Sequence, residues 1–196
     1  MNVKIVRRVL LIGGMLALAS CQSPAPAPQS FPDLHFSAAP LRLDVARIEV
    51  VDRYHPVLDP PHVEERLPVP LPHVLENWGR ERFQAVGSRG TAVVTVDDAS
   101  ATATPLPKQQ GFSAQFTAQA DTRYDLHVAA TVEIRDERGF PVRSANAKAD
   151  HSYTTLEDVT LDQRDRELYR IESEVMADLD RQITGEIQSG FSPYLQ

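Results

Sequence analysis

Hydrophobic and polar residues alternate along two stretches of the first half of the chain, which predicts β-strands there. Residues 41–51 alternate with a slip near Ala46 and Arg47 that suggests a bulge, and residues 91–96 repeat the pattern more briefly. Between them, residues 55–72 hold six prolines, which cannot donate hydrogen bonds to a central ladder. We therefore expect two strands separated by an extended surface loop or an edge segment.

The period-two pattern is longest over residues 124–134, where six apolar side chains alternate with a polar face. A turn follows at residues 136–139, with Gly139 at the position that favours a positive φ. The return strand over residues 142–154 carries small side chains on one face: Ala145, Ala147 and Ala149. This pattern predicts a β-hairpin whose alanine face allows a helix to pack closely.

Two amphipathic helices are predicted around these strands. Residues 71–86 place their apolar side chains on one face, with Gly79 among them. Residues 160–189 begin with a capping box of Thr160 and Gln163 and continue with apolar residues at every third or fourth position. The pattern covers barely three heptads, which favours a packed helix over a coiled coil.

The order of these elements predicts the fold class. Consecutive hairpin-linked strands favour antiparallel pairing, so we expect an α+β fold (β-α-β-β-β-α) with an antiparallel four-stranded sheet and two helices on one face. The opposite face of the sheet is polar and is expected to meet solvent or a partner. The patterns divide the chain into residues 1–20, residues 21–40 and a single globular domain over residues 41–196.

The start of the chain has the pattern of an export signal. Three basic residues precede an apolar run at residues 9–17, which would rise only about 15 Å as a helix and is too short to span a bilayer. The run ends in Leu18-Ala19-Ser20-Cys21, which resembles a bacterial lipobox. The resemblance implies signal cleavage between Ser20 and Cys21 and a diacylglyceryl group on the Cys21 sulfur. The alternative is an ordinary secretory signal that is cleaved near Ala19.

The lone cysteine favours the lipoprotein interpretation. Cys21 has no intramolecular disulfide partner, and an unmodified exposed thiol is a liability in an oxidising compartment. Gln22 follows it, and by analogy with enterobacterial sorting a residue other than Asp there favours the periplasmic face of the outer membrane. Residues 22–40 are rich in Pro and Ala, which predicts a semi-rigid tether of up to roughly 60 Å.

Composition narrows the choice of partners. The chain has 27 acidic and 20 basic residues, which gives a formal net charge of −7. A chain this acidic lacks the electrostatic footprint of a nucleic-acid-binding protein. With 42% apolar residues and one cysteine it is neither a disulfide scaffold nor a multi-span membrane protein.

Few residues form patterns associated with catalysis. The six histidines include no pair at helical i, i+4 spacing. His62-Val63-Glu64-Glu65-Arg66 resembles an inverted zinc-protease motif but has Arg66 where the second ligand must be His, so a solvated loop is favoured. Asp97 and Asp98 lack the ligand spacing of a calcium loop, and no phosphate loop or nucleophile elbow is present. We therefore expect no enzyme, with no catalytic residues, metal site or cofactor.

Two charged residues fall within apolar helix faces. Arg82 lies in the apolar stripe of the first predicted helix, and Glu172 lies in that of the last. If both helices lie side by side on one sheet, the two residues can form a structural ion pair; alternatively, each reaches past its neighbours to water. Trp78 is expected in the core rather than on a binding platform.

Two wider resemblances suggest a function. The lipobox, the tether and the β-α-β-β-β-α order are similar to envelope lipoproteins that assist transport, such as the lipopolysaccharide-assembly lipoprotein that plugs an outer-membrane barrel and the auxiliary lipoproteins of ABC-type lipid-trafficking systems. Residues 75–87 (LENWGRERFQAVG) resemble a family of uncharacterised alphaproteobacterial lipoproteins.

These resemblances imply an accessory, assembly or docking component of the cell envelope, which binds the membrane through acylated Cys21 and an envelope protein as its partner. The alternative is a module that holds a lipid or a cell-wall fragment between the helices and the sheet. A filled helix–sheet interface would favour docking, whereas an apolar cavity above about 300 Å³ would favour ligand binding.

Overall fold

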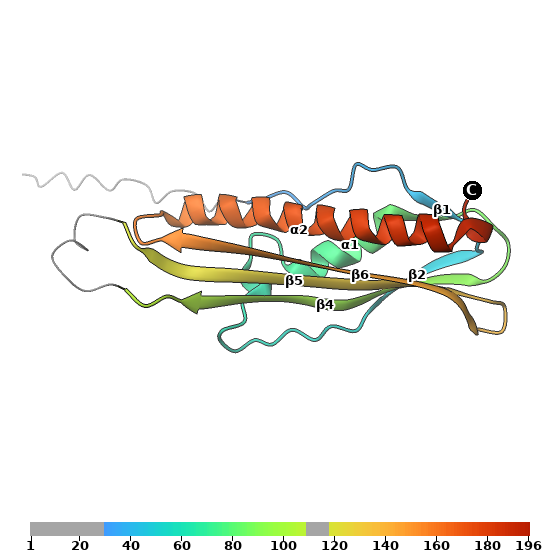
Figure 1. Cartoon of the computed structure of the whole chain (residues 1–196), viewed down its shortest axis with the longest axis horizontal. Coiled ribbons are helices and arrows are strands. Elements are labelled where there is room, and N and C mark those ends of the chain that lie inside the picture. Colours follow the sequence, from blue (N-terminus) through green and yellow to red (C-terminus); the bar gives the residue numbers. More distant parts are fainter. Residues whose placement is uncertain (1–29, 109–117) are drawn as a thin grey trace, which may run out of the picture.

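Four strands form the main sheet in the computed structural model, which describes residues 30–108 and 118–196. The strands lie in the order β2-β4-β5-β6, and β4, β5 and β6 are long (Figure 1). Their bounds are β2, Arg47–Asp52; β4, Thr91–Pro105; β5, Ala120–Arg135; and β6, Pro141–Leu156. The strand predicted at residues 91–96 thus continues for nine further residues, past a bulge between Val96 and Asp98.

The sheet is mixed, so the prediction of a purely antiparallel sheet is wrong. β4, β5 and β6 pair antiparallel as predicted, but β2 runs parallel to β4 in a register that pairs Arg47 with Thr91. The helix α1 (Leu71–Arg82) lies between β2 and β4 in the chain. A helical crossover of this kind returns the chain to the same end of the sheet, so the two strands must run in the same direction.

The first predicted strand is in fact two strands that belong to different sheets. β1 (Leu41–Leu43) pairs in parallel with β3 (Phe83–Ala85), and the chain then crosses to the main sheet as β2. The slip near Ala46 marks this change of sheet rather than a bulge. The helix predicted to residue 86 ends at Arg82, because the next three residues form β3.

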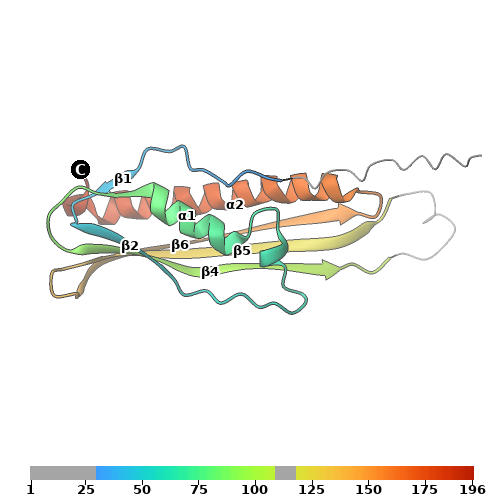
Figure 2. The same ribbon diagram turned by 180° about the vertical axis from the view of Figure 1, so that it is seen from behind.

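Both helices cover one face of the sheet, as predicted (Figures 1 and 2). The long helix α2 (Leu161–Gly190) packs over β6, where Ala145, Ala147 and Ala149 are buried beneath it. Its predicted capping box is confirmed, since the side chains and backbone amides of Thr160 and Gln163 bond reciprocally. Trp78 on α1 is fully buried against the edge of the Phe83 ring, which confirms its place in the core.

The proline-rich loop between β2 and α1 forms an edge segment of the sheet. It lies against β4, where the Val63 amide donates to the Ala101 carbonyl and the Ala103 amide donates to the Pro61 carbonyl, both at 2.8 Å. The loop contains a short 3₁₀ helix, η1 (Glu64–Arg66). These bonds complete the edge of β4 beyond the point where its pairing with β2 ends.

Residues 30–40, called the strap below, pack on the helices. Leu34 is buried in the core, and the ring of Phe31 lies 5.3 Å from that of Tyr169 on α2. The folded part of the chain therefore extends into the segment predicted as tether.

Two glycines with positive φ, Gly90 and Gly139, lie at one end of the sheet, and their substitution tests the backbone conformation and the close packing there. Gly90 has φ +73°, and a Cβ there would lie 2.6 Å from the Arg135 carbonyl oxygen; Gly139 has φ +84° and open space around it. Gly139→Ala should lower the free energy of unfolding by about 1 kcal/mol through the left-handed backbone alone. Gly90→Ala adds the clash and should cost about 3 kcal/mol. Urea denaturation measures both, and equal losses would contradict the close approach at Gly90.

Candidate functional site

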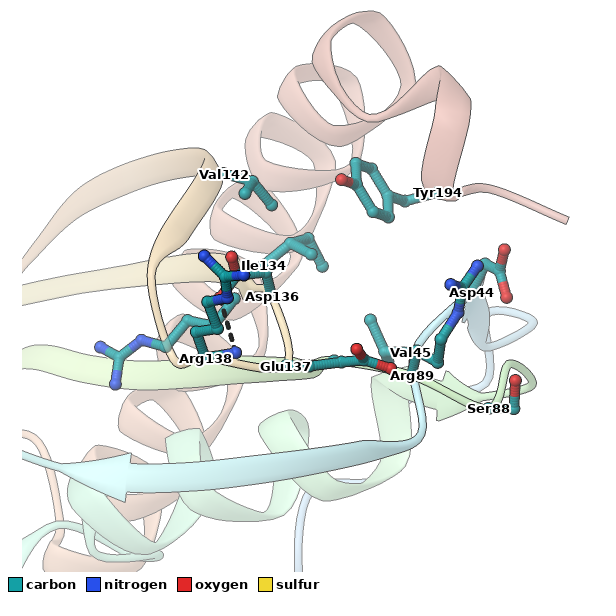
Figure 3. Close-up of a pocket in the computed structure, with 12 residues that line it drawn as sticks. Asp44, Val45, Ser88, Arg89, Ile134, Asp136, Glu137, Arg138, Val142 and Tyr194 are labelled. Atoms are coloured by element: carbon teal, nitrogen blue, oxygen red, sulfur yellow. Dashed lines mark hydrogen bonds between the residues drawn. The ribbon is translucent and has the colours of Figure 1, made fainter.

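One end of the sheet carries the surface most suited to recognition. It comprises residues 86–90, which join β3 to β4, the β5–β6 turn at residues 136–140, and Tyr194 near the C-terminus; we call it the tip surface. An open cavity of about 420 Å³ lies among these segments. Figure 3 shows Arg89 and Asp44 on one side of it and Asp136 and Arg138 on the other.

The β5–β6 turn is rigid and presents an apolar side chain. Asp136 Oδ1 accepts hydrogen bonds from the backbone amides of Arg138 at 2.9 Å and Phe140 at 2.8 Å. The Gly139 amide donates to the Asp136 carbonyl at 3.0 Å, and its positive φ confirms the turn predicted from the sequence. The Phe140 side chain that follows is 64% exposed. Phe140 is not among the residues that form the core of the described domain or pack against it.

Charged side chains of both signs line the two cavities beside the turn that carries Phe140. A second open cavity of about 500 Å³ shares the two loops with the first and is lined also by Arg47 and Glu49. Among residues 30–108 and 118–196, Arg89 and Arg138 form no ion pair. An exposed aromatic side chain with a charged, open rim is the arrangement typical of a protein-binding surface. The sequence signal was available, since Phe140 directly follows the turn, but its exposure could not be judged without the fold.

The lipidation and cleavage predictions concern residues that the structure does not describe. Cys21 and Ser20 both lie outside the described residues. They remain predictions from the lipobox alone.

The predicted ion pair between Arg82 and Glu172 is wrong. Arg82 Nε donates to Asp180 Oδ1 at 2.7 Å, and Trp78 Nε1 donates to the same oxygen at 2.9 Å. Arg82 also donates to the Thr184 hydroxyl at 3.2 Å. The C-terminal end of α1 therefore meets α2 about 12 Å beyond Glu172, because eight residues of helix separate Glu172 from Asp180.

Glu172 is buried without an ionic partner. It is fully inaccessible to solvent, and neither carboxylate oxygen has a hydrogen-bond partner of ordinary geometry in the described structure. Burial raises the pKa of Glu172 to about 8; the backbone amide of Val69 offsets part of this effect, and the Asp165 carboxylate adds to it. At neutral pH this side chain is therefore largely protonated.

In the motif at residues 62–66, Glu64 forms hydrogen bonds that hold the proline-rich loop in place. Glu64 is buried, not solvated as expected, and accepts hydrogen bonds from the Tyr54 hydroxyl at 2.6 Å and the Val57 amide at 3.0 Å. Burial raises the pKa of Glu64, but these hydrogen bonds outweigh it and hold the pKa below its usual value. Its role is to attach the proline-rich loop to the sheet.

The aspartates at the β4 bulge serve local geometry. Asp97 accepts from the Thr131 hydroxyl at 2.6 Å, and Asp98 accepts from the Ser100 amide at 2.9 Å. Within the described ranges, no group of three His, Cys, Asp or Glu side chains could hold a metal ion. In the same ranges, no helix has both the length and the apolar content needed to cross a membrane.

Comparisons with known proteins give weak likenesses only. No protein-family model matches the chain, and no curated protein sequence matches it. Among solved structures, a minor lipoprotein from Acinetobacter baumannii is 17% identical, with a TM-score of 0.41 over 75% of this chain and 93% of that one. A candidate lipoprotein from Caulobacter crescentus CB15 is 13% identical, with a TM-score of 0.36 over 69% of this chain and 83% of that one. Similarity this low carries no argument about fold or function.

Proposed function

We propose that this chain is a lipoprotein held by acylated Cys21 at the periplasmic face of the outer membrane, where it binds another envelope protein as an accessory or assembly component and catalyses no reaction. The anchor rests on the lipobox sequence. The binding role rests on the packing of the domain and on the tip surface.

The filled interface between the helices and the sheet is the observation that favours docking on a protein over binding of a lipid. The apolar side chains of α1 and α2 and the facing strand residues form one buried cluster that includes Trp78, Met176 and Leu126. The alanine face of β6 is used for close approach of α2. An open cavity of about 460 Å³ is lined by Ala147 and by Gln182 of α2, but Asp97 and Lys148 also line it, so it is not an apolar cavity. A cavity of about 250 Å³ beside the strap lies outside this interface and is smaller than a ligand site is expected to be.

The tip surface is well placed to meet a partner away from the membrane. The strap enters the domain near Tyr169, in the first third of α2, whereas the tip surface lies beyond the C-terminal end of that helix (Figure 1). Twenty-one residues separate Tyr169 from Gly190, which is about 30 Å of helix. A protein anchored through its N-terminus would thus present Phe140 at its far end.

Affinity purification from native membranes in mild detergent tests this proposal. We expect a stoichiometric envelope protein to co-purify with the wild-type chain and to be at least tenfold depleted with Phe140→Asp, because a charge replaces the exposed ring. Leu161→Asp is the matched control, since Leu161 is 70% exposed at the opposite end of the domain. It should retain the partner.

The lipid anchor is tested separately from the binding of a partner. Cys21→Ala should abolish the membrane fraction of the protein, and mass spectrometry of the mature N-terminus should show the acyl groups in the wild type only. Recovery of the wild-type chain alone, or full retention of the partner by Phe140→Asp, would contradict the docking role.

A further inference from the structure

The strap is attached to α1 mainly through the Glu81 carboxylate, with a longer contact of 3.8 Å between the exposed side chains of Asp33 and His73. Glu81 Oε1 bonds the His35 ring nitrogen Nδ1 at 2.9 Å, and Glu81 Oε2 accepts a hydrogen bond from the Phe36 backbone amide at 3.1 Å. These bonds hold the pKa of Glu81 below its usual value, with the Phe36 amide the largest cause. Both oxygens of Glu81 are thus engaged by the strap.

A second attachment lies at the end of the strap. The Arg82 guanidinium, already paired with Asp180, donates to the Ala39 carbonyl. Within the strap, Leu34 is the only buried residue, and Phe31 and Phe36 are half-buried against the core. No backbone-to-backbone hydrogen bond joins the strap to the rest of the described chain, so side-chain contacts alone hold it.

The strap does not fill the space beside it. A cavity of about 250 Å³ separates strap residues 34–38 from α2, where it is lined by Ser173, Ala177 and Asp180. Figure 2 shows the strap running along the helices to β1 without entering a sheet before Leu41. A segment with one buried and two half-buried apolar side chains, few polar attachments and an adjacent cavity can open without unfolding the core.

We propose that the strap is a releasable latch on the α1–α2 surface, held by Glu81, whose opening lengthens the free segment between the membrane anchor and the domain. Residues 22–30 can span at most roughly 30 Å, and release of residues 31–40 adds at most roughly 33 Å more. The latch itself is independent of the anchor, but its effect on reach rests on the lipid attachment proposed above.

Hydrogen–deuterium exchange of the full chain tests the latch. In the wild type, the Phe36 amide, which donates to Glu81 Oε2, should exchange at least 100-fold faster than the amides of β5, yet at least tenfold slower than in an unstructured peptide of the same sequence. Glu81→Gln removes the charge that both strap contacts use and should speed exchange of the Phe36 amide at least fivefold, with β5 unchanged. Glu76→Gln is the matched control, since within residues 30–108 and 118–196 Glu76 pairs only with Arg80 on the same helix.

Two outcomes would overturn the latch. Strap exchange as slow as that of β5 would make the strap an integral part of the core, and exchange at the unstructured rate would mean that nothing holds it. An unchanged exchange rate in Glu81→Gln would show that Glu81 does not hold the strap.

The reach is measured separately on the acylated protein in phosphatidylethanolamine–phosphatidylglycerol vesicles. Energy transfer from a dye at the tip surface to a membrane dye should rise in Glu81→Gln relative to Glu76→Gln, because release moves the point where the free segment joins the domain from Tyr169 to β1, which lies at the tip surface. Unchanged transfer together with faster strap exchange would overturn the effect on reach while leaving the latch. Absence of vesicle binding by both proteins would instead reject the lipid anchor, and with it the effect on reach.

Discussion

Replacing Asp180 with alanine should lower the free energy of unfolding by about 3–5 kcal/mol. Arg82 is 5% exposed, and its guanidinium and the Trp78 indole both donate to Asp180 Oδ1. Removing the carboxylate leaves a buried cation and a buried N–H group without their acceptor, and both have already lost their contacts with water. Urea denaturation of the full chain, followed by the fluorescence of Trp78, measures the loss.

Asp178→Ala provides the matched control for this prediction. Asp178 lies two residues earlier on α2 and pairs with His151 and Arg181, but its side chain and that of Arg181 are exposed to solvent to 35% and 73%. Pairs of this exposure contribute about 1 kcal/mol or less. Losses of similar size in the two variants would contradict the conclusion that Asp180 joins α1 to α2 through buried hydrogen bonds.

The sequence predicted that Arg82 and Glu172 lie within apolar helix faces but could not predict their partners. Periodicity places a residue on a face of its own helix; it contains no information on where along α2 the end of α1 makes contact. Asp180 itself lies near the edge of the α2 stripe and is partly exposed, so it resembles the other acidic residues of that helix until α1 is placed beside it.

Local sequence patterns were also insufficient to predict how all the strands of the sheet pair. The hairpin β5–β6 was predictable because the turn, the alternation and the pairing register are local. The parallel pairing of β2 with β4 and the small sheet of β1 with β3 depend on how the chain returns after α1, which no local pattern records. The exposure of Phe140 could not be predicted for a similar reason, since an apolar residue after a turn can equally well belong to the core.

Replacing Glu172 with glutamine should stabilise the domain, and increasingly so as the pH rises. The pKa of Glu172 is about 8 in the folded domain, against an ordinary value of 4.5. The folded state therefore binds this proton more tightly than the unfolded state, so the wild type loses stability as the pH rises from 4.5 through 8. Each unit of difference between the folded and unfolded pKa corresponds to 1.36 kcal/mol. The wild type therefore loses about 3 kcal/mol of unfolding free energy by pH 7 and about 4 kcal/mol by pH 8.

Glutamine keeps the shape of this side chain but cannot ionise, so the variant avoids that loss. The difference in unfolding free energy between Glu172→Gln and the wild type should grow from about 1 kcal/mol at pH 5 to about 4 kcal/mol at pH 8. Denaturation in urea at several pH values measures it, and Glu186→Gln, an exposed position on the same helix, should show no such trend. A difference that is constant with pH would mean that Glu172 stays ionised in the core, with a partner for its charge. In that case the end of α1 near Val69 is the place to search for it, because its amide is the polar group that faces the carboxylate.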